Sequence, residues 1–149
     1  MAGKTDTFER DFLKLIFNGT AIANIADNAA SSPITNLYVS LHTADPTDAA
    51  ASGQSTSETT YTGYSRVAVA RTTGGWTVST VAGVTTVVPV ANITFGICTA
   101  GTATITHVGI GTAASGAGYL LFSGSLSPTI AVASGVTPQL TTASKITED

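Results

Sequence analysis

The order of apolar and polar residues changes from a helical to a strand pattern near Pro33. Within TDTFERDFLKLIFNGT, apolar side chains recur every three or four positions and form one stripe, made of Phe8, Phe12, Leu15 and Ile16. This spacing is typical of an amphipathic helix. Asp6 and Glu9 have the spacing of a capping box, and Gly19 fits the left-handed residue that follows a helix. We therefore predict a short N-terminal helix.

From residue 36 onward the apolar positions alternate with a period of two. In NLYVSLHT, the side chains of Leu37, Val39 and Leu41 fall on one face, which predicts a strand with that face in the core. Further short β-branched runs follow, separated by turn residues: YSRVAVAR, WTVSTV, VTTVVPV, NITFGIC, ATITHVGI, YLLFSGSL, TIAVA and VTPQLTT. Eight or nine strands without helical crossovers predict an all-β, antiparallel β-sandwich, and a jelly roll fits the strand count best.

The chain of 149 residues is long enough for one domain with a sizeable core. We predict a helical arm over residues 1–32 and a β-sandwich, jelly-roll-like domain over residues 33–149. The domain would close its own core, so we expect the arm to matter more for assembly than for folding. The run ADPTDAAASGQSTSETTYTG lacks periodicity and predicts a long polar loop after the first strand.

Charged residues are scarce and unevenly placed. They make up 10% of the chain, the net charge is −3, and no Asp, Glu, Lys or Arg lies between Arg71 and Lys145. Free monomers usually carry charges that keep them soluble and protect strand edges. The gap therefore favours a surface covered by neighbouring subunits over a Thr- and Ser-rich solvent face. Nucleic acid and membranes are not expected as partners.

The histidines are the first candidates for site chemistry. His42 ends the first predicted strand and precedes Asp45-Pro46, a pair that initiates turns. We expect His42 to bond to loop backbone. A metal site would need His107 together with Asp48 or the single cysteine, Cys98, and no ligand spacing supports one. We expect no metal.

Motifs for catalysis are absent as well. The chain has no G-x-S-x-G elbow, and GTAASGAGY is neither a dinucleotide fingerprint nor a P-loop. The carboxylates Asp45, Asp48 and Glu58 all lie in or beside the long polar loop. We therefore expect no catalytic residue, no cofactor and no enzymatic activity. The sequence also shows neither a membrane span nor a signal peptide.

Six residues are candidates for contacts with partners. Phe8 and Phe12 belong to the apolar stripe of the helix, and two tyrosines lie in the loop region. Thr77 and Ser79 alternate with apolar neighbours, so they should face outward from their strand. The predicted interface set is Phe8, Phe12, Tyr61, Tyr64, Thr77 and Ser79.

Several motifs in order resemble a known family. They are LYVSLHTADP, GYSRVAVAR, ITFGICTAGTATITHVGI and GYLLFSGSLSPTIAVASGVTP. This pattern is similar to small virion proteins of tailed bacteriophages, which are often labelled tail fibre protein, and most closely to jelly-roll decoration or cement proteins of capsid shells. The chain departs from the pattern in TDAAASGQSTSETTYT and in its polar ending TTASKITED.

The resemblance implies a virion structural protein made in the host cytoplasm. Its partners would be the major capsid protein and other copies of itself, and it would reinforce the shell from the capsid surface. Two alternatives stay open: a tail, baseplate or tail-fibre component, and a receptor- or carbohydrate-binding β-module on the virion. A hydrolase that uses His42 or His107 has the least support.

Overall fold

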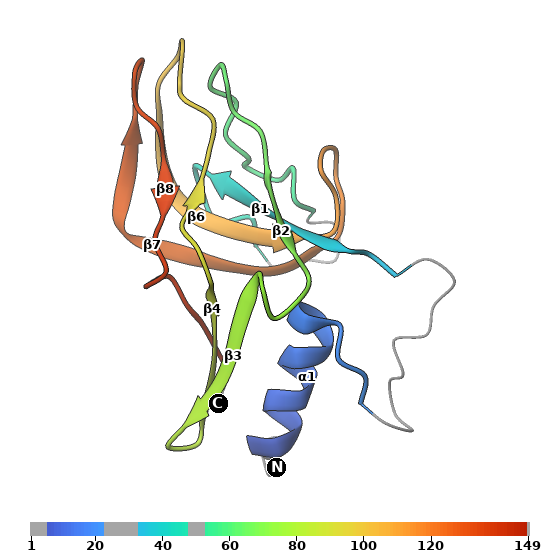
Figure 1. Ribbon diagram of the computed structural model, residues 1–149. Coiled ribbons are helices and arrows are strands. Elements are labelled where there is room, and N and C mark those ends of the chain that lie inside the picture. The colour runs from blue at the N-terminus through green and yellow to red at the C-terminus, as the bar shows by residue number, and fades with distance from the viewer. Residues whose placement is uncertain (1–5, 23–32, 48–52, 149) are drawn as a thin grey trace. The chain divides into compact units, whose positions relative to one another are not determined.

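A computed structural model describes residues 6–22, 33–47 and 53–148 of the chain (Figure 1). The chain divides into two compact units, and each is described by itself. Unit 1 comprises residues 1–35, 70–93 and 140–149, and unit 2 comprises residues 36–69 and 94–139. In the described part of the chain, no helix is long and apolar enough to cross a membrane.

Unit 2 is built on a four-stranded sheet with the strand order β2-β1-β6-β7. Its members are β1 (Asn36–His42), β2 (Val67–Ala70), β6 (Ala103–Gly111) and β7 (Leu120–Val132). Strand β1 pairs antiparallel with β6, so that Val39 lies opposite Ile110 and His42 lies opposite His107. Leu37, Val39 and Leu41 are all at most 1% exposed, as the alternation predicts.

The second face of β1 is buried too, since Ser40 and His42 are fully buried. The following loop pairs with the edge of the strand, where the amide of Thr59 donates to the carbonyl of Leu41 and the amide of Thr43 donates to that of Ser57, each at 2.9 Å. The carbonyl of Thr56 in this loop lies 2.8 Å from His42 Nδ1.

Strand β7 is one long element where the sequence predicts two. Its register against β6 shifts between Ile105 and His107, whose partners are Ile130 and Ser125. Residues 126–129 of β7 form this irregularity. Pro128 lies there, where its missing amide costs no regular ladder bond. The strand is strongly curved in Figure 1.

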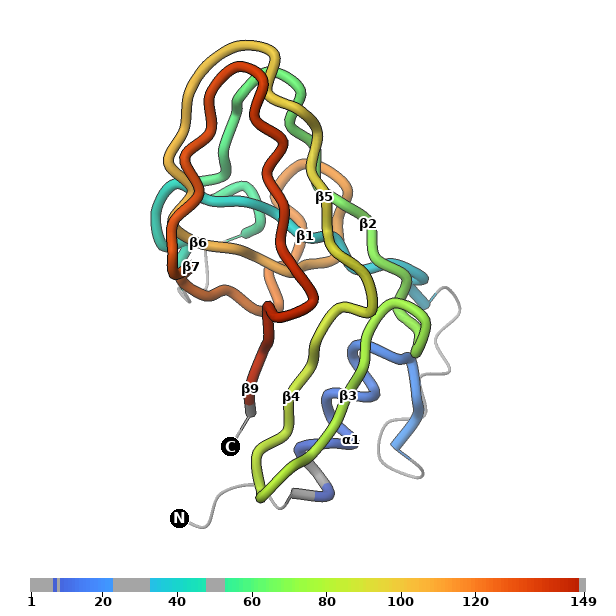
Figure 2. The backbone as a smooth tube through the Cα atoms, turned by 60° about the vertical axis from the view of Figure 1, so that its left-hand side comes forward, coloured from blue at the N-terminus to red at the C-terminus, as the bar shows by residue number. Residues whose placement is uncertain are grey.

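Unit 1 packs the helix against a small sheet. Helix α1 (Asp6–Asn18) contacts β3 (Trp76–Val81) and β4 (Val84–Pro89), and β4 pairs with β9 (Ile146–Glu148). Figure 2 shows β3 and β4 side by side, with β9 next to β4. Leu13 and Phe17 are fully buried, and the rings of Phe17 and Trp76 meet edge to face at 5.0 Å. The remaining strands, β5 (Ile93–Thr94) and β8 (Gln139–Leu140), pair with each other.

The C-terminal end of α1 is closed by backbone and side-chain bonds. Gly19 has a φ of 64°, as expected for the residue that ends a helix, and the amide of Thr20 donates to the carbonyl of Lys14 at 3.1 Å. The Arg71 guanidinium donates to the carbonyls of Leu15 and Ile16. A cation at this end also complements the helix dipole. Burial lowers the pKa of Arg71.

Trp76 provides a probe of how the helix packs. Deleting residues 1–18 is expected to shift the emission of this single tryptophan to the red, because the residue is 2% exposed and its ring packs against Phe17. Fluorescence spectra of the two proteins measure the effect. Thr77→Ala is the control, since Thr77 is exposed and its loss should leave the emission unchanged. Equal spectra for the truncated and full-length chains would mean that other residues cover Trp76.

The predicted fold class is confirmed: the protein is all-β, with antiparallel sheets and one short helix. A jelly roll consists of eight strands in two Greek keys. The described strands form sheets of four, three and two strands. The number of strands is close to that of a jelly roll, but in the described part of the chain they are not arranged in the jelly-roll order. One compact unit groups α1 with β3 and β4, which the helix contacts. The division at residue 32 and the independent folding of residues 33–149 stay predictions.

Candidate functional site

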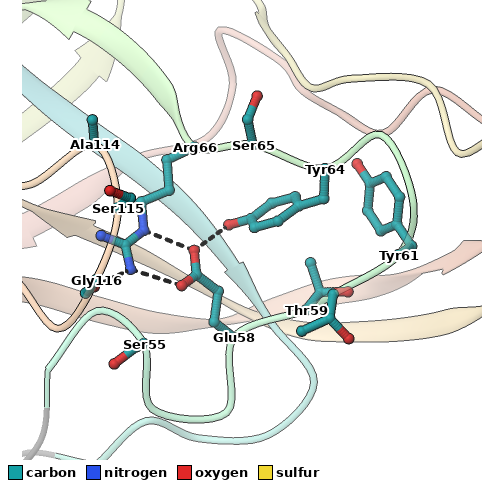
Figure 3. Close-up of a pocket in the computed structure, with 11 residues that line it drawn as sticks. Ser55, Glu58, Thr59, Tyr61, Tyr64, Ser65, Arg66, Ala114, Ser115 and Gly116 are labelled. Carbon is teal, nitrogen blue, oxygen red and sulfur yellow. Dashed lines mark hydrogen bonds and ion pairs between the residues drawn. The ribbon is translucent and has the colours of Figure 1, made fainter.

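Unit 2 contains a buried ion pair between Glu58 and Arg66. Arg66 Nε donates to Glu58 Oε1 and Arg66 Nη2 donates to Glu58 Oε2, each at 2.7 Å (Figure 3). The two side chains are 15% and 2% exposed, respectively. The fork of two parallel bonds is the strong, directional form of an arginine–carboxylate contact. The hydrogen bonds to Glu58 raise the pKa of Arg66.

Tyr64 extends this pair toward β1. Its hydroxyl donates to Glu58 Oε1 at 2.7 Å and accepts from the amide of Leu41 at 3.0 Å. Burial, followed by the contact with Glu58, raises the pKa of Tyr64, so the phenol stays protonated. The charged side chain of Glu58 and the neutral side chain of Tyr64 thereby join the loop to the sheet.

Arg66 also holds the hairpin loop between β6 and β7. Its Nη1 donates to the carbonyl of Ala113 at 2.9 Å, and its Nη2 donates to that of Gly116 at 2.7 Å. The buried amide of Gln54 repeats this arrangement: Nε2 donates to Tyr38 O at 2.9 Å, and Oε1 accepts from the amide of Ala113 at 3.0 Å. Two loops distant in sequence are therefore fixed to each other by two side chains.

Gly111 makes room for the Gln54 side chain. A Cβ atom at this position would lie 2.2 Å from Gln54 Cδ. A larger residue at 111 would therefore displace Gln54 and disrupt the contact between the two loops.

His42 bonds to the loop backbone, as predicted. Its Nδ1 lies 2.8 Å from the carbonyl of Thr56, and its Nε2 lies 2.9 Å from Ser40 Oγ. With the proton on Nδ1, that nitrogen donates to the carbonyl and Nε2 accepts from the serine. The neutral ring is thus satisfied on both sides. The turn prediction is confirmed as well, since Asp45 Oδ1 accepts from the amide of Thr47 at 2.9 Å.

The burial of His42 should make the protein less stable in mild acid. Burial lowers its pKa from the ordinary value of 6.5, so the unfolded chain binds the proton more readily than the folded one. The contribution of His42 to the free energy of unfolding should be constant above pH 6.5. It should then fall as the pH is lowered from 6.5 toward the lowered pKa, by at most about 1.4 kcal/mol per pH unit. Urea unfolding at pH 7 and pH 5.5 measures this loss. It should shrink in His42→Gln and persist in His107→Gln; an unchanged loss in His42→Gln would assign it to other groups.

A pocket of about 440 Å³ opens beside the ion pair. Two loops of unit 2 line it with Ser55, Glu58, Thr59, Thr60, Tyr61, Tyr64, Ser65, Arg66, Ala114, Ser115 and Gly116. Most of these side chains are small or carry hydroxyl groups. The Thr59 hydroxyl is buried and meets no hydrogen-bond partner among the described residues. Glu58, Tyr64 and Arg66 point toward one another at the pocket wall (Figure 3).

The predicted interface residues occupy different environments. Thr77 and Ser79 are exposed on β3, as expected, and Phe12 is half-buried. The side chain of Phe8 lies outside the described residues. Tyr61 is buried: the residue is 5% exposed, and its hydroxyl donates to Gly96 O at 2.9 Å.

Within the predicted set, the structure brings Tyr61 and Tyr64 into contact. The rings of Tyr61 and Tyr64 meet at 5.4 Å, and Tyr64 also stacks on Phe95 at 6.3 Å. These tyrosines therefore form a small aromatic core under the loop. A role in partner contacts stays a prediction for all six residues.

The sequence reasoning missed Arg66 and considered Glu58 only as a possible catalytic carboxylate. A signal was present: Glu58, Arg66 and Arg71 are the only charged residues from position 49 to 144. Opposite charges in so poor a background are good candidates for a pair. Among the described residues, no three His, Cys, Asp or Glu side chains are grouped so that they could hold a metal ion; Asp48 lies outside the described residues.

The buried polar side chains of unit 2 connect its loops to the sheet. The class of the protein comes from a comparison with known families. The chain is a bacteriophage virion structural protein, and it belongs to the family described as Podophage GP4 fiber I protein gp80, which it matches over residues 3–147. No curated protein matches it.

Proposed function

We propose that the chain is a structural subunit of a virion fibre, as part of the tail apparatus. The family match carries this proposal, because it spans residues 3–147 and the family's description names a fibre protein. The expected decoration of the capsid shell lacks such support and becomes the second candidate, based on the resemblance of the strand motifs. In either role the chain would act by adhesion and not as an enzyme.

The surface of unit 1 supports association with other copies of the chain. The outward face of the β3–β4 hairpin pairs Thr77 with Val88, Ser79 with Thr86, and Val81 with Val84. None of these residues is charged, and Val81 is 73% exposed. Uncharged strand surfaces invite pairing or packing with other chains. We propose that the fibre is a homo-oligomer in which this face is covered.

Immunogold labelling of intact virions tests the location. An antibody against this chain should place gold on fibres at the tail. Gold spread evenly over the shell would instead establish capsid decoration and refute the fibre proposal. Light scattering on the purified protein tests the oligomer, which should have a mass that is a multiple of the 14.9 kDa chain. A monomer at high concentration would contradict self-association.

A further inference from the structure

Strand β7 forms one edge of the four-stranded sheet in unit 2. In the described part of the chain it pairs only with β6, and Figure 1 shows it on the far side of β6 from β1. An edge strand presents backbone amides and carbonyls to whatever lies beside it, and proteins usually protect such an edge with charged side chains, proline or a bulge. None of the 13 residues of β7 is charged. Its edge is therefore open to pairing wherever proline and bulges are also absent.

Proline and irregular register protect only parts of β7. The irregularity at residues 126–129 includes Pro128, and the register shifts again at the start of the strand, beside Leu120. Between these two places, residues 122–125 pair with β6 in regular register. Residues 123–125 are exposed. The unprotected part of the edge is therefore the segment 122–125.

The apolar face of the sheet is incomplete along this segment. One row of side chains across the sheet ends at Phe122, whose partner on β6 is Ile110, and the next row ends at Gly124, whose partner is Val108. Residues two apart on a strand lie on the same face. A Cβ atom at Gly124 would meet no described atom within 4 Å. The sheet therefore leaves an open space over Gly124, on the face that carries Phe122.

We propose that β7 pairs with β7 of a second copy of the chain, antiparallel and with Ser123 on the two-fold axis. In this register Phe122 of each copy lies opposite Gly124 of the other copy, on the same face of the joined sheets. An aromatic side chain that packs over a cross-strand glycine stabilises the pairing of edge strands. The two sheets thus become one continuous sheet, and the open space over each glycine is filled.

Symmetry and charge favour a second copy as the occupant of this edge. In a two-fold contact each residue meets one from the same stretch, so a charge near the axis would face its own like charge. No charged residue lies between Arg71 and Lys145. An axis through Gly124 would place two glycines opposite each other and leave the space empty, whereas an axis through Ser123 fills it from within the segment. This contact is additional to the covered β3–β4 face proposed above and does not depend on it.

Disulfide trapping in the full-length chain tests the proposal. On the axis, the two Cα atoms of residue 123 would lie about 4.5–5.5 Å apart, a distance that a disulfide can span. Ser123→Cys should therefore be converted by mild oxidation to a cross-linked dimer, at twice the mass of the 14.9 kDa chain on a non-reducing gel. The parent should stay uncross-linked, because its own cysteine, Cys98, is buried. Free thiols are blocked before the gel.

Ser125→Cys is the matched control for the register. Ser125 is exposed on the same strand and, two residues from Ser123, on the same face. With the axis at Ser123, the two copies of residue 125 would lie at least about 13 Å apart, which is too far for a disulfide. This variant should stay monomeric on the gel.

A charge at the edge should prevent the cross-link. Gly124→Lys adds a side chain where the structure has room for one, so the fold should be kept while the pairing is lost. Combined with Ser123→Cys, it should abolish the dimer band. Thr129→Lys is the control, since Thr129 is exposed but lies in the irregular part of β7; it should leave the cross-link intact. Circular dichroism shows whether both lysine variants fold.

Three results would overturn the inference: a monomeric Ser123→Cys, a Ser125→Cys that cross-links as readily, or a cross-link that survives Gly124→Lys. The first is also the result expected if β7 pairs instead with β2, the opposite edge of the sheet, in another copy. None of the three bears on the fibre location, which the immunogold labelling decides.

Discussion

Replacing Arg66 with methionine is expected to lower the free energy of unfolding by about 3–5 kcal/mol, the usual cost of leaving a buried charge without its partner. Methionine keeps the length of the side chain but offers no donor to Glu58, whose side chain is only 15% exposed. The carbonyls of Ala113 and Gly116 would lose their donors as well. Urea unfolding at pH 7 measures the change.

The chain contains a matched control for this experiment. Arg10 and Asp11 also form an ion pair, at 3.0 Å, but their side chains are 39% and 36% exposed. Arg10→Met should therefore cost less than about 1 kcal/mol, because solvent screens the pair. Adding Glu58→Gln to Arg66→Met should recover part of the loss, since it removes the uncompensated charge and keeps an acceptor for Tyr64. A loss below 1 kcal/mol in Arg66→Met would show that water replaces the guanidinium.

A single carboxylate on the outer face of β3 should block assembly of the virion fibre. Thr77→Asp and Ser79→Asp place a charge at exposed positions whose cross-strand neighbours are Val88 and Thr86. In the free protein the charge stays hydrated and the stability changes little. In a covered interface the charge would lose its water without gaining a partner, at a cost of roughly 5 kcal/mol. Particles from complementation with each variant, probed by immunoblot, should lack the chain.

The control for assembly is Ser55→Asp, which adds the same charge to an exposed position in the loop of unit 2. It should enter particles normally. Circular dichroism should show that all three variants fold. If Thr77→Asp and Ser79→Asp are incorporated like the parent, this face meets solvent in the virion, and the lack of charge between Arg71 and Lys145 has another cause.

Local patterns were enough to predict most of the strands. The alternation around Val39 located β1 correctly, and the helix ends at Asn18 because Gly19, which follows it, tolerates a positive φ. The two errors have physical reasons. Strand β7 continues through Ser127-Pro128 because an irregularity accommodates the proline, whereas proline read in isolation predicts a break. Strand β9, in the polar ending, forms through pairing with β4, which no local period reveals.

The site was harder to predict than the fold. Glu58 and Arg66 are eight residues apart in a stretch without periodicity, so their pairing depends on the path of the loop and not on a repeat. The carbonyls that complete the site, at Ala113 and Gly116, are backbone groups that any residue could supply. The environment of His42 was easier to predict, because a strand followed by Asp45-Pro46 already places the ring against a turn.

The closure of α1 by Arg71 gives the protein a built-in site for limited proteolysis. Trypsin must draw the Arg71 side chain into its own specificity pocket, but here the guanidinium is bonded to the carbonyls of Leu15 and Ile16. The next residue that trypsin recognises is Lys145. Cleavage after Arg71 would therefore release one long fragment that begins at Thr72. The rate at which this fragment appears would report how often the hydrogen bonds between Arg71 and the end of the helix break.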